Sequence, residues 1–275
     1  MIIQETYELL RSKYNYLFQS TTIEKVVISI PNTMVKLSSG YCGIAKTEIH
    51  SFDCSYYNHK KYFGDFSPGK ISGQKILDLF NYPENSEILS VVKLAVLNAV
   101  SAEIIEKSDY TIIEDKDPID LIDLSGEKNI CIVGAFQSYI NKISNTSNKL
   151  FVLELNENAF SEEQKKYYVP AERASEIFAV SDIVIITGST LANNTIDNLL
   201  KNIPSLSQTI VVGPTSSIIP DILFKYNVNI IGSTKIMDSE KAFAIISEAG
   251  AGFHLFKYCA KKICLINDSK KPIKQ

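Results

Sequence analysis

The feature that most constrains this fold is an alternation that begins at residue 129. Five short apolar runs start at intervals of roughly 20 to 30 residues, enough for a crossover helix between neighbours. Their near-continuous Val and Ile content is typical of strands buried on both faces, as in a parallel sheet. The pattern therefore predicts a doubly wound α/β domain. The runs are 129–133, 150–155, 182–186, 209–212 and 228–231.

The first 127 residues follow a different pattern, with a predicted helix at 3–17, short strands and then two more helices. The strands, at 24–30, 34–37 and 41–47, indicate an antiparallel meander. We predict a small α+β domain over 1–84 and a mainly parallel α/β domain over 85–275, with the long helix packed near their junction. The remaining predicted segments are a loop at 50–69, helices at 72–80 and 86–106, and a linker at 107–127.

Composition and charge narrow the classes of partner. The formal net charge is −3 and no half of the chain is basic, so the electrostatic footprint of a nucleic-acid-binding protein is missing. The N-terminus carries charges among its apolar residues, which argues against a signal peptide. The apolar run 88–100 is interrupted by Lys93 and Asn98 and is too short to span a bilayer. We expect a cytoplasmic protein with a small-molecule or metal-complex partner and no nucleic-acid or membrane partner; a homo-oligomer is left open.

Glycine and hydroxyl residues gather directly after the predicted strands. Glycine lets a backbone approach a ligand closely, and the helix that follows presents free N–H groups and a positive dipole end. Such residues are also ordinary turn and N-cap residues, but their clustering at several strand ends indicates a site for an anionic or carboxylate-bearing ligand. The loops are 134–136, 187–195, 213–217 and 232–234.

The predicted strand order places three of these loops together. In the order 2-1-3-4-5 the first, third and fourth runs are neighbours, and the switch point lies between the first and third. We predict a pocket floored by 134–136, 187–195 and 213–217, with Asn98 and residues of 31–47 as its other wall. The chain carries no P-loop, dinucleotide-binding or nucleophile-elbow motif.

Soft metal donors do not converge on these loops. Cys42, His50, Cys54 and His59 lie in one stretch, at intervals that match no standard zinc pattern. Any metal is therefore expected to bind through a ligand, with oxygen donors from the loops, and replacing Cys42 and Cys54 by Ser should leave metal content unchanged. The other cysteines are predicted to pack in the core or in a terminal helix: Cys131, Cys259 and Cys264.

Several stretches together resemble the family described as putative heavy-metal chelation, which has no assigned function. The resemblance runs from about residue 5 to 250, and its most specific part is the block T-G-S-T-x-x-N-x-T-I with G-P-T about 25 residues on. The stretches are 26–47, Asn98-Ala99, 134–136, 186–200 and 211–217.

The resemblance implies an enolase-N-terminal-like domain joined to a Rossmann-like domain, with a cleft between them and a link to heavy-metal or corrinoid metabolism. Family members often have Gly where this chain has Asn194, a residue that tolerates left-handed geometry. The positions that match the family are Asn98, Gly134, Phe136, Glu154, Thr187, Gly188, Thr190, Asn193, Thr195, Gly213 and Pro214. The loop pattern adds Ser189, Thr215 and Ser216 to these candidate ligand-binding residues.

Two functional hypotheses follow. In the first, the protein binds or handles a small anionic ligand or a metal chelate, because no His, Lys or Cys follows the main strand ends. In the second, it is a lyase-type or transferase-type enzyme acting on an anionic metabolite, with Glu154 or Glu172 as general base. The sequence identifies neither the ligand nor a metal or other cofactor.

Overall fold

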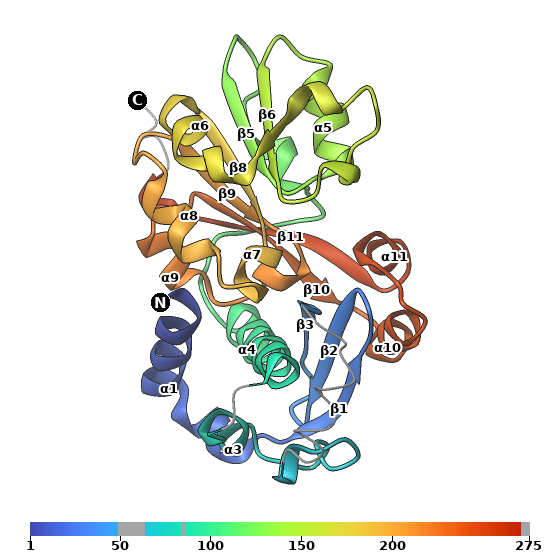
Figure 1. Ribbon diagram of the computed structural model, residues 1–275. Helices are drawn as coiled ribbons and strands as arrows, with labels where there is room; N and C mark the ends of the chain where they lie inside the picture. The colour runs from blue at the N-terminus through green and yellow to red at the C-terminus, as the bar shows by residue number, and fades with distance from the viewer. Residues whose placement is uncertain (49–63, 84–85, 271–275) are drawn as a thin grey trace.

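The protein consists of a small antiparallel sheet and a large, mainly parallel sheet, joined by a long helix (Figure 1). The computed structural model describes residues 1–48, 64–83 and 86–270. The predicted loop at 50–69 therefore lies largely outside the described residues, as do His50, Cys54 and His59.

The N-terminal part opens with helix α1 and a three-stranded meander in the order β1-β2-β3, all antiparallel. Helix α4 begins at the N-cap Ser86, whose hydroxyl accepts a hydrogen bond from the Leu89 amide at 3.0 Å. The elements are α1 Ile2–Ser20, β1 Ile23–Ile28, β2 Asn32–Leu37, β3 Cys42–Lys46, η1 Gly64–Phe66, α3 Ile76–Asn81 and α4 Glu87–Glu106. The predicted helices and strands of this part are thus confirmed to within a few residues, although α3 starts later than expected.

The large sheet has eight strands in the order β4-β11-β10-β9-β8-β5-β6-β7. Its strands are β4 Ile112–Glu114, β5 Asn129–Val133, β6 Lys149–Glu154, β7 Tyr168–Pro170, β8 Ile183–Thr187, β9 Gln208–Val212, β10 Ile230–Ile236 and β11 Ala260–Ile266. Its helices are α5 Gln137–Ser144, α6 Ala174–Val180, α7 Ser189–Ala192, α8 Ile196–Asn202, α9 Pro220–Lys225, α10 Ser239–Ser247 and α11 Gly252–Tyr258. Short 3₁₀ turns are η2 Pro118–Leu121, η3 Glu157–Ala159, η4 Lys165–Tyr167, η5 Ala171–Arg173, η6 Pro214–Ser216 and η7 Asp268–Lys270.

The predicted order of the five apolar runs is confirmed. β5 pairs in parallel with β6 and β8, β8 with β9, and β9 with β10. With β7 added, the six parallel strands follow the order 3-2-1-4-5-6, which is the order of dinucleotide-binding folds. Strand order reverses between β5 and β8, where the sequence placed the switch point.

Alternate residues of each parallel strand face opposite sides of the sheet, and each side is covered by helices. Cys131, Val184 and Val211 pack into a core that includes α6, α8, α9 and α4, whereas Ile132 and Ile185 pack on the side of α5 and η2. Both faces of the sheet are therefore buried, which explains the near-continuous Val and Ile runs.

Helix α4 fills the space between the two sheets (Figure 1). Its side chains pack on β2 and β3 and share one continuous core with α1 and the large sheet. By length and composition it could cross a membrane, but 78% of its apolar stretch is buried inside the protein, as in the core helix of a globular fold. The opposite face of the small sheet, with Met34 and Ile44, packs on α10 and α11.

The C-terminal segment differs from the sequence prediction. We expected Cys259 and Cys264 in a terminal helix, but Cys264 lies in β11, which pairs antiparallel with β10 and with β4. In β11, Lys261 and Lys262 directly follow Ala260, so the strand has no continuous apolar run to mark it. β4 is only three residues long and lies within the predicted linker. The segment 107–127 is thus part of the sheet edge and not a free linker.

Candidate ligand cleft

A cleft of about 710 Å³ lies at the carboxyl ends of β5, β6 and β8, at the switch point of the sheet. Its size is in the range of small-molecule sites, roughly 300 to 1,000 Å³. The predicted site residues on its wall are Gly134, Phe136, Glu154, Thr187, Ser189, Thr190, Asn193 and Thr195. Lys46, the last residue of β3, and Glu48, two residues further on, contribute the wall from the small N-terminal unit.

The loop after β5 comes very close to the end of β8. Gly134 has φ +100°, and a Cβ built on it would lie 3.1 Å from Cγ2 of Thr187. A larger residue would suffer both from the left-handed backbone and from this contact. Glycine at 134 therefore lets the two strand ends meet at the floor of the cleft.

Glu154 ends β6 on the cleft wall, with its carboxylate held by the backbone. It accepts hydrogen bonds from the amides of Ala135 at 2.9 Å, Leu155 at 2.7 Å and Asn156 at 3.2 Å. Three backbone donors fix the orientation of this carboxylate. Glu172, the other candidate general base, is exposed in η5 and does not line the cleft.

The loop after β8 forms two short helices, α7 and α8, linked by a turn at 193–195. Asn193 is the C-cap of α7, and its side-chain oxygen accepts from the amide of Thr195 at 3.2 Å and from its hydroxyl at 2.7 Å. Asn194 has φ +58°, the left-handed geometry for which the sequence flagged this position. We expected Thr190 and Asn193 to present their side chains at one helix start. Thr190 is instead buried and donates to the Thr187 carbonyl at 2.6 Å.

The loop after β9, which the sequence predicted as part of the floor, faces elsewhere. Thr215 and Ser216 are 3% and 0% exposed, and neither they nor Gly213 and Pro214 line the cleft. The Thr215 hydroxyl accepts from the Lys46 amide at 2.9 Å, and the Ser216 hydroxyl lies within hydrogen-bond distance of the Gly213 and Gly232 carbonyls. This loop joins the two units of the molecule.

Two further predicted residues lie at the same junction. Asn98 on α4 is fully buried and donates to the carbonyls of Ile44 at 2.7 Å and Thr215 at 3.1 Å. Gly188 packs against η6, since a Cβ there would lie 2.9 Å from the Ser216 nitrogen. These residues hold β3, α4 and η6 together behind the cleft, so the structure does not bring them to its wall.

Sequence reasoning missed the two charged residues of the opposite wall. Lys46 and Glu48 are two positions apart, and neither has an ion-pair partner within 1–48, 64–83 and 86–270. No motif marks them, because their role depends on where β3 docks against the large sheet. The only available signal was a pair of opposite charges at the end of the predicted strand 41–47.

A metal cage built from protein side chains is not found among the described residues, where no group of three or more His, Cys, Asp or Glu side chains converges. Burial also raises the pKa of the Cys42 thiol to about 12. The free thiol is therefore protonated at neutral pH, whereas a metal ion binds the thiolate.

Fold and cleft together define a two-part α/β protein in which a small antiparallel unit closes over the switch point of a parallel sheet. Two family models, both described as putative heavy-metal chelation, match this chain at residues 11–101 and 117–265. The second match alone covers more than half of the chain, so the protein belongs to the putative heavy-metal chelation family. The resemblance noted in the sequence is thereby confirmed.

Known structures share the whole architecture. A DUF364-family protein of unknown function from Pyrococcus horikoshii superposes with a TM-score of 0.74 at 19% identity, over 96% of this chain and 99% of its own. Another from Desulfitobacterium hafniense gives 0.69 at 15% identity, over 94% and 98%. An uncharacterized protein of Methanocaldococcus jannaschii is 37% identical over 81 residues, and the match spans 30% of this chain and 31% of that protein. The two solved structures show the fold, and none of these matches assigns an activity.

Proposed function

We propose that this protein binds a small anionic metal chelate in the switch-point cleft. The observation that carries the proposal is the pair Lys46 and Glu48 on the wall that faces the strand-end loops. Lys46 has no ion-pair partner among the described residues, and its ammonium suits the carboxylates of a chelator. Glu48 likewise has none there, and its carboxylate is an oxygen donor for a hard or borderline metal ion. A chelate presents both charges at once, whereas a bare anion or a bare cation would use only one of the two residues.

The opposite wall supports the same class of ligand. Hydroxyls and amides of the loop 187–195 supply neutral donors and acceptors, and Phe136 adds an apolar surface. These oxygen and nitrogen atoms are uncharged. Because the rigid sheet holds them in place, they can orient a polar ligand. The acidic residues of the cleft do not converge into a metal-binding group among the described residues. The metal would therefore be held largely by its own chelator.

Nickel citrate is a suitable probe, with citrate alone and nickel chloride alone as comparisons in isothermal titration. Lys46→Met should weaken binding of both citrate and nickel citrate at least about tenfold, because a charge-assisted hydrogen bond contributes about 1.5–3 kcal/mol. Glu48→Gln should weaken nickel citrate only. Both variants should keep the melting temperature, since the two side chains have no partner among the described residues.

Lys201→Met is the matched control, because Lys201 is an exposed lysine at the end of α8 outside the cleft wall. It should bind all three probes like the parent protein. If Lys46→Met and Lys201→Met bind nickel citrate equally well, or if nickel chloride alone binds as tightly as the chelate, the proposal is wrong. Native mass spectrometry with metal analysis of the purified protein would identify a retained chelate directly.

A further inference from the structure

The lining of the cleft combines charged residues with an apolar surface. Lys46 and Glu48 come from the small unit, whereas the part contributed by the end of β6, η5, α6 and α8 is largely aliphatic. Leu155, which follows β6 on the cleft wall, is 75% exposed although it is a large apolar residue. The other aliphatic residues of this part include Ala171, Ala174 and Leu199. A ligand that fills the cleft is therefore expected to carry an apolar group as well as charges.

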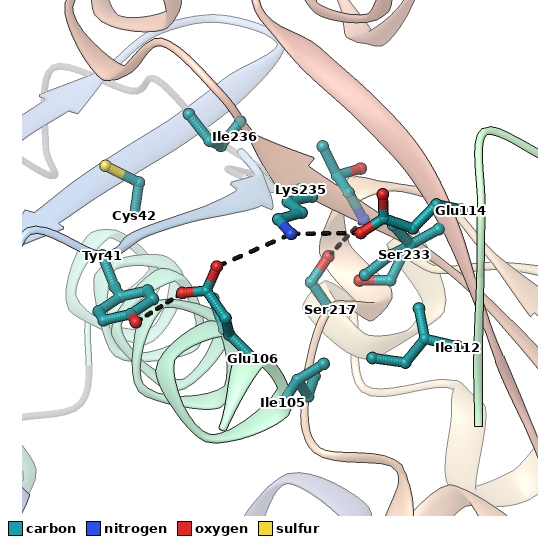
Figure 2. Close-up of a pocket in the computed structure, with 13 residues that line it drawn as sticks. Tyr41, Cys42, Ile105, Glu106, Ile112, Glu114, Ser217, Ser233, Lys235 and Ile236 are labelled. Atoms are coloured by element: carbon teal, nitrogen blue, oxygen red, sulfur yellow. Dashed lines mark hydrogen bonds and ion pairs between the residues drawn. The ribbon is translucent and has the colours of Figure 1, made fainter. Parts of the chain in front are cut away.

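The charges in the cleft are free, unlike those at a smaller cavity of about 100 Å³ between β3, α4 and β10. Figure 2 shows Lys235 there, 3.2 Å from Glu114 and 3.7 Å from Glu106, so its ammonium already has two carboxylate partners. Lys46 and Glu48 have no ion-pair partner among residues 1–48, 64–83 and 86–270. Magnesium is usually held by one or two carboxylates together with substrate phosphates, and lysine is a common phosphate partner. This pair therefore fits a magnesium-bound phosphate chain.

Glu154 offers an acceptor for a hydroxyl of the ligand. Its Oε1 accepts from the Leu155 and Asn156 amides, and its Oε2 accepts from the Ala135 amide. A carboxylate has about four acceptor sites, so one site on Oε2 remains. In dinucleotide-binding folds, an acidic residue about 20 residues after the first glycine of the turn accepts from a ribose 2′-hydroxyl. Glu154 has that place relative to Gly134, at the end of the strand that pairs with β5.

Phe136 restricts the kind of nucleotide that the cleft can hold. The dinucleotide fingerprint has a second glycine two residues after the first, which lets the backbone approach a pyrophosphate. Here that position is Phe136, which lines the cleft and stacks on Tyr139 with ring centroids 5.4 Å apart. A bulky ring at this position blocks the approach, so the cleft excludes a dinucleotide. The phosphates of a mononucleotide are instead expected on the wall that carries Lys46.

We propose that the anionic chelate of the cleft is the magnesium complex of a ribonucleoside diphosphate. The base contacts Leu155, the ribose 2′-hydroxyl donates to Glu154, and Lys46 and Glu48 bind the phosphates and their magnesium ion. This inference rests on the proposed function, because it assigns a chemical class to the same ligand in the same cleft. It adds two requirements that a chelate in general does not have, a ribose hydroxyl and an apolar base.

The test is isothermal titration of the full-length protein with ADP and magnesium chloride. The parent protein should bind magnesium ADP, and nickel citrate should compete with it because both need Lys46. 2′-Deoxy-ADP should bind at least about tenfold more weakly, because it lacks the hydroxyl that donates to the Glu154 carboxylate. ADP without magnesium should also bind more weakly, since Glu48 then faces the phosphates directly. NAD should not bind.

Two variants examine the ribose and the base separately. In Glu154→Gln the amide oxygen keeps the two backbone donors of Oε1, and the NH₂ group replaces Oε2 and cannot accept, so ADP and 2′-deoxy-ADP should bind alike. Glu157→Gln is the matched control, because Glu157 is exposed in η3 outside the cleft wall, and it should keep the preference for ADP. Leu155→Ser should weaken magnesium ADP about fivefold through lost apolar contact and leave nickel citrate unchanged.

The outcomes separate this inference from the proposed function. If the parent protein binds nickel citrate but not magnesium ADP, the inference is wrong and the chelate proposal stands. If it binds neither probe, both are wrong. The inference is also overturned if the parent protein binds ADP and 2′-deoxy-ADP equally well, or if Leu155→Ser binds magnesium ADP as tightly as the parent.

Discussion

The loops 187–195 and 213–217 are alike in composition and differ in what they face. Both follow buried strands, and both combine glycine with several hydroxyl residues. Side chains of the first line the cleft. In the second, the buried Thr215 and Ser216 hydroxyls bond to β3 and β10, and the Thr215 carbonyl accepts from Asn98 of α4. Strand-end loops with the same residues can therefore be either a ligand wall or an internal joint. The side on which a second unit docks decides between the two.

Gly188, where the two loops touch, should be the position most sensitive to change. Gly188→Ala would place a Cβ 2.9 Å from the backbone nitrogen of Ser216, which cannot move without displacing the joint. We expect a loss of about 3 kcal/mol in unfolding free energy, the upper part of the range for overpacking. Chemical denaturation would measure it.

Gly252→Ala is the control for that substitution. A Cβ on Gly252 would lie no closer than 3.7 Å to its nearest neighbour, in Pro214, and the residue is in a helix where alanine is preferred. It should be neutral or slightly stabilising. Equal effects of the two substitutions would show that the loops do not form a tight joint at Gly188.

A matched pair of hydroxyl substitutions distinguishes the buried loop 213–217 from the loop 187–195 on the cleft wall. Thr215→Val leaves the Lys46 amide without its acceptor and should cost about 1.5 kcal/mol, within the range for a buried unmet donor. Ser189→Ala, on the cleft wall, should change stability by less than about 0.5 kcal/mol but weaken nickel citrate. Thermal unfolding and calorimetric titration of both variants provide the comparison. Opposite results for the two residues would reverse the roles given to the loops.

Asn193→Ala should destabilise the protein less than Gly188→Ala or Thr215→Val. On the sequence alone we expected no loss, because alanine favours a helix start. The side chain instead accepts two hydrogen bonds from Thr195 at the turn between α7 and α8. By analogy with helix caps, a loss of about 0.5 to 1 kcal/mol is expected, with weaker chelate binding. A fully stable variant with unchanged binding would mean that the turn neither needs the Asn193 side chain nor uses it for the ligand.

Much of the fold was predictable because it depends on local periodicity. Runs of Val and Ile identified β5, β6, β8, β9 and β10 and their order, since burial on both faces leaves a strong signal. β11 was missed because Lys261 and Lys262 interrupt its apolar pattern. The edge strands β4 and β7 were missed because each has only three residues, and β7 ends in Pro170. Short edge strands carry little pattern of their own.

The site was predictable only in part. The switch-point argument located the cleft and its loops 134–136 and 187–195, because strand order determines which carboxyl ends meet. The sequence did not predict that Lys46 and Glu48 line the cleft. It did predict Asn98, Thr215 and Ser216 there, whereas the structure buries them away from the cleft wall. The reason is that the docking of the small unit is a long-range contact with no local sequence signature. The division at residue 84 and the likeness to an enolase N-terminal domain stay predictions.

The most direct test of this account is hydrogen–deuterium exchange of the full-length protein with and without saturating nickel citrate. The account predicts slower exchange at 134–136 and 187–195, the two loops that line the cleft, and little change at 213–217, which is already buried. It also predicts that Lys46→Met removes this protection at the same chelate concentration. Protection confined to 213–217, or a pattern that Lys46→Met leaves intact, would contradict both the placement of the site and the separate roles of the two loops.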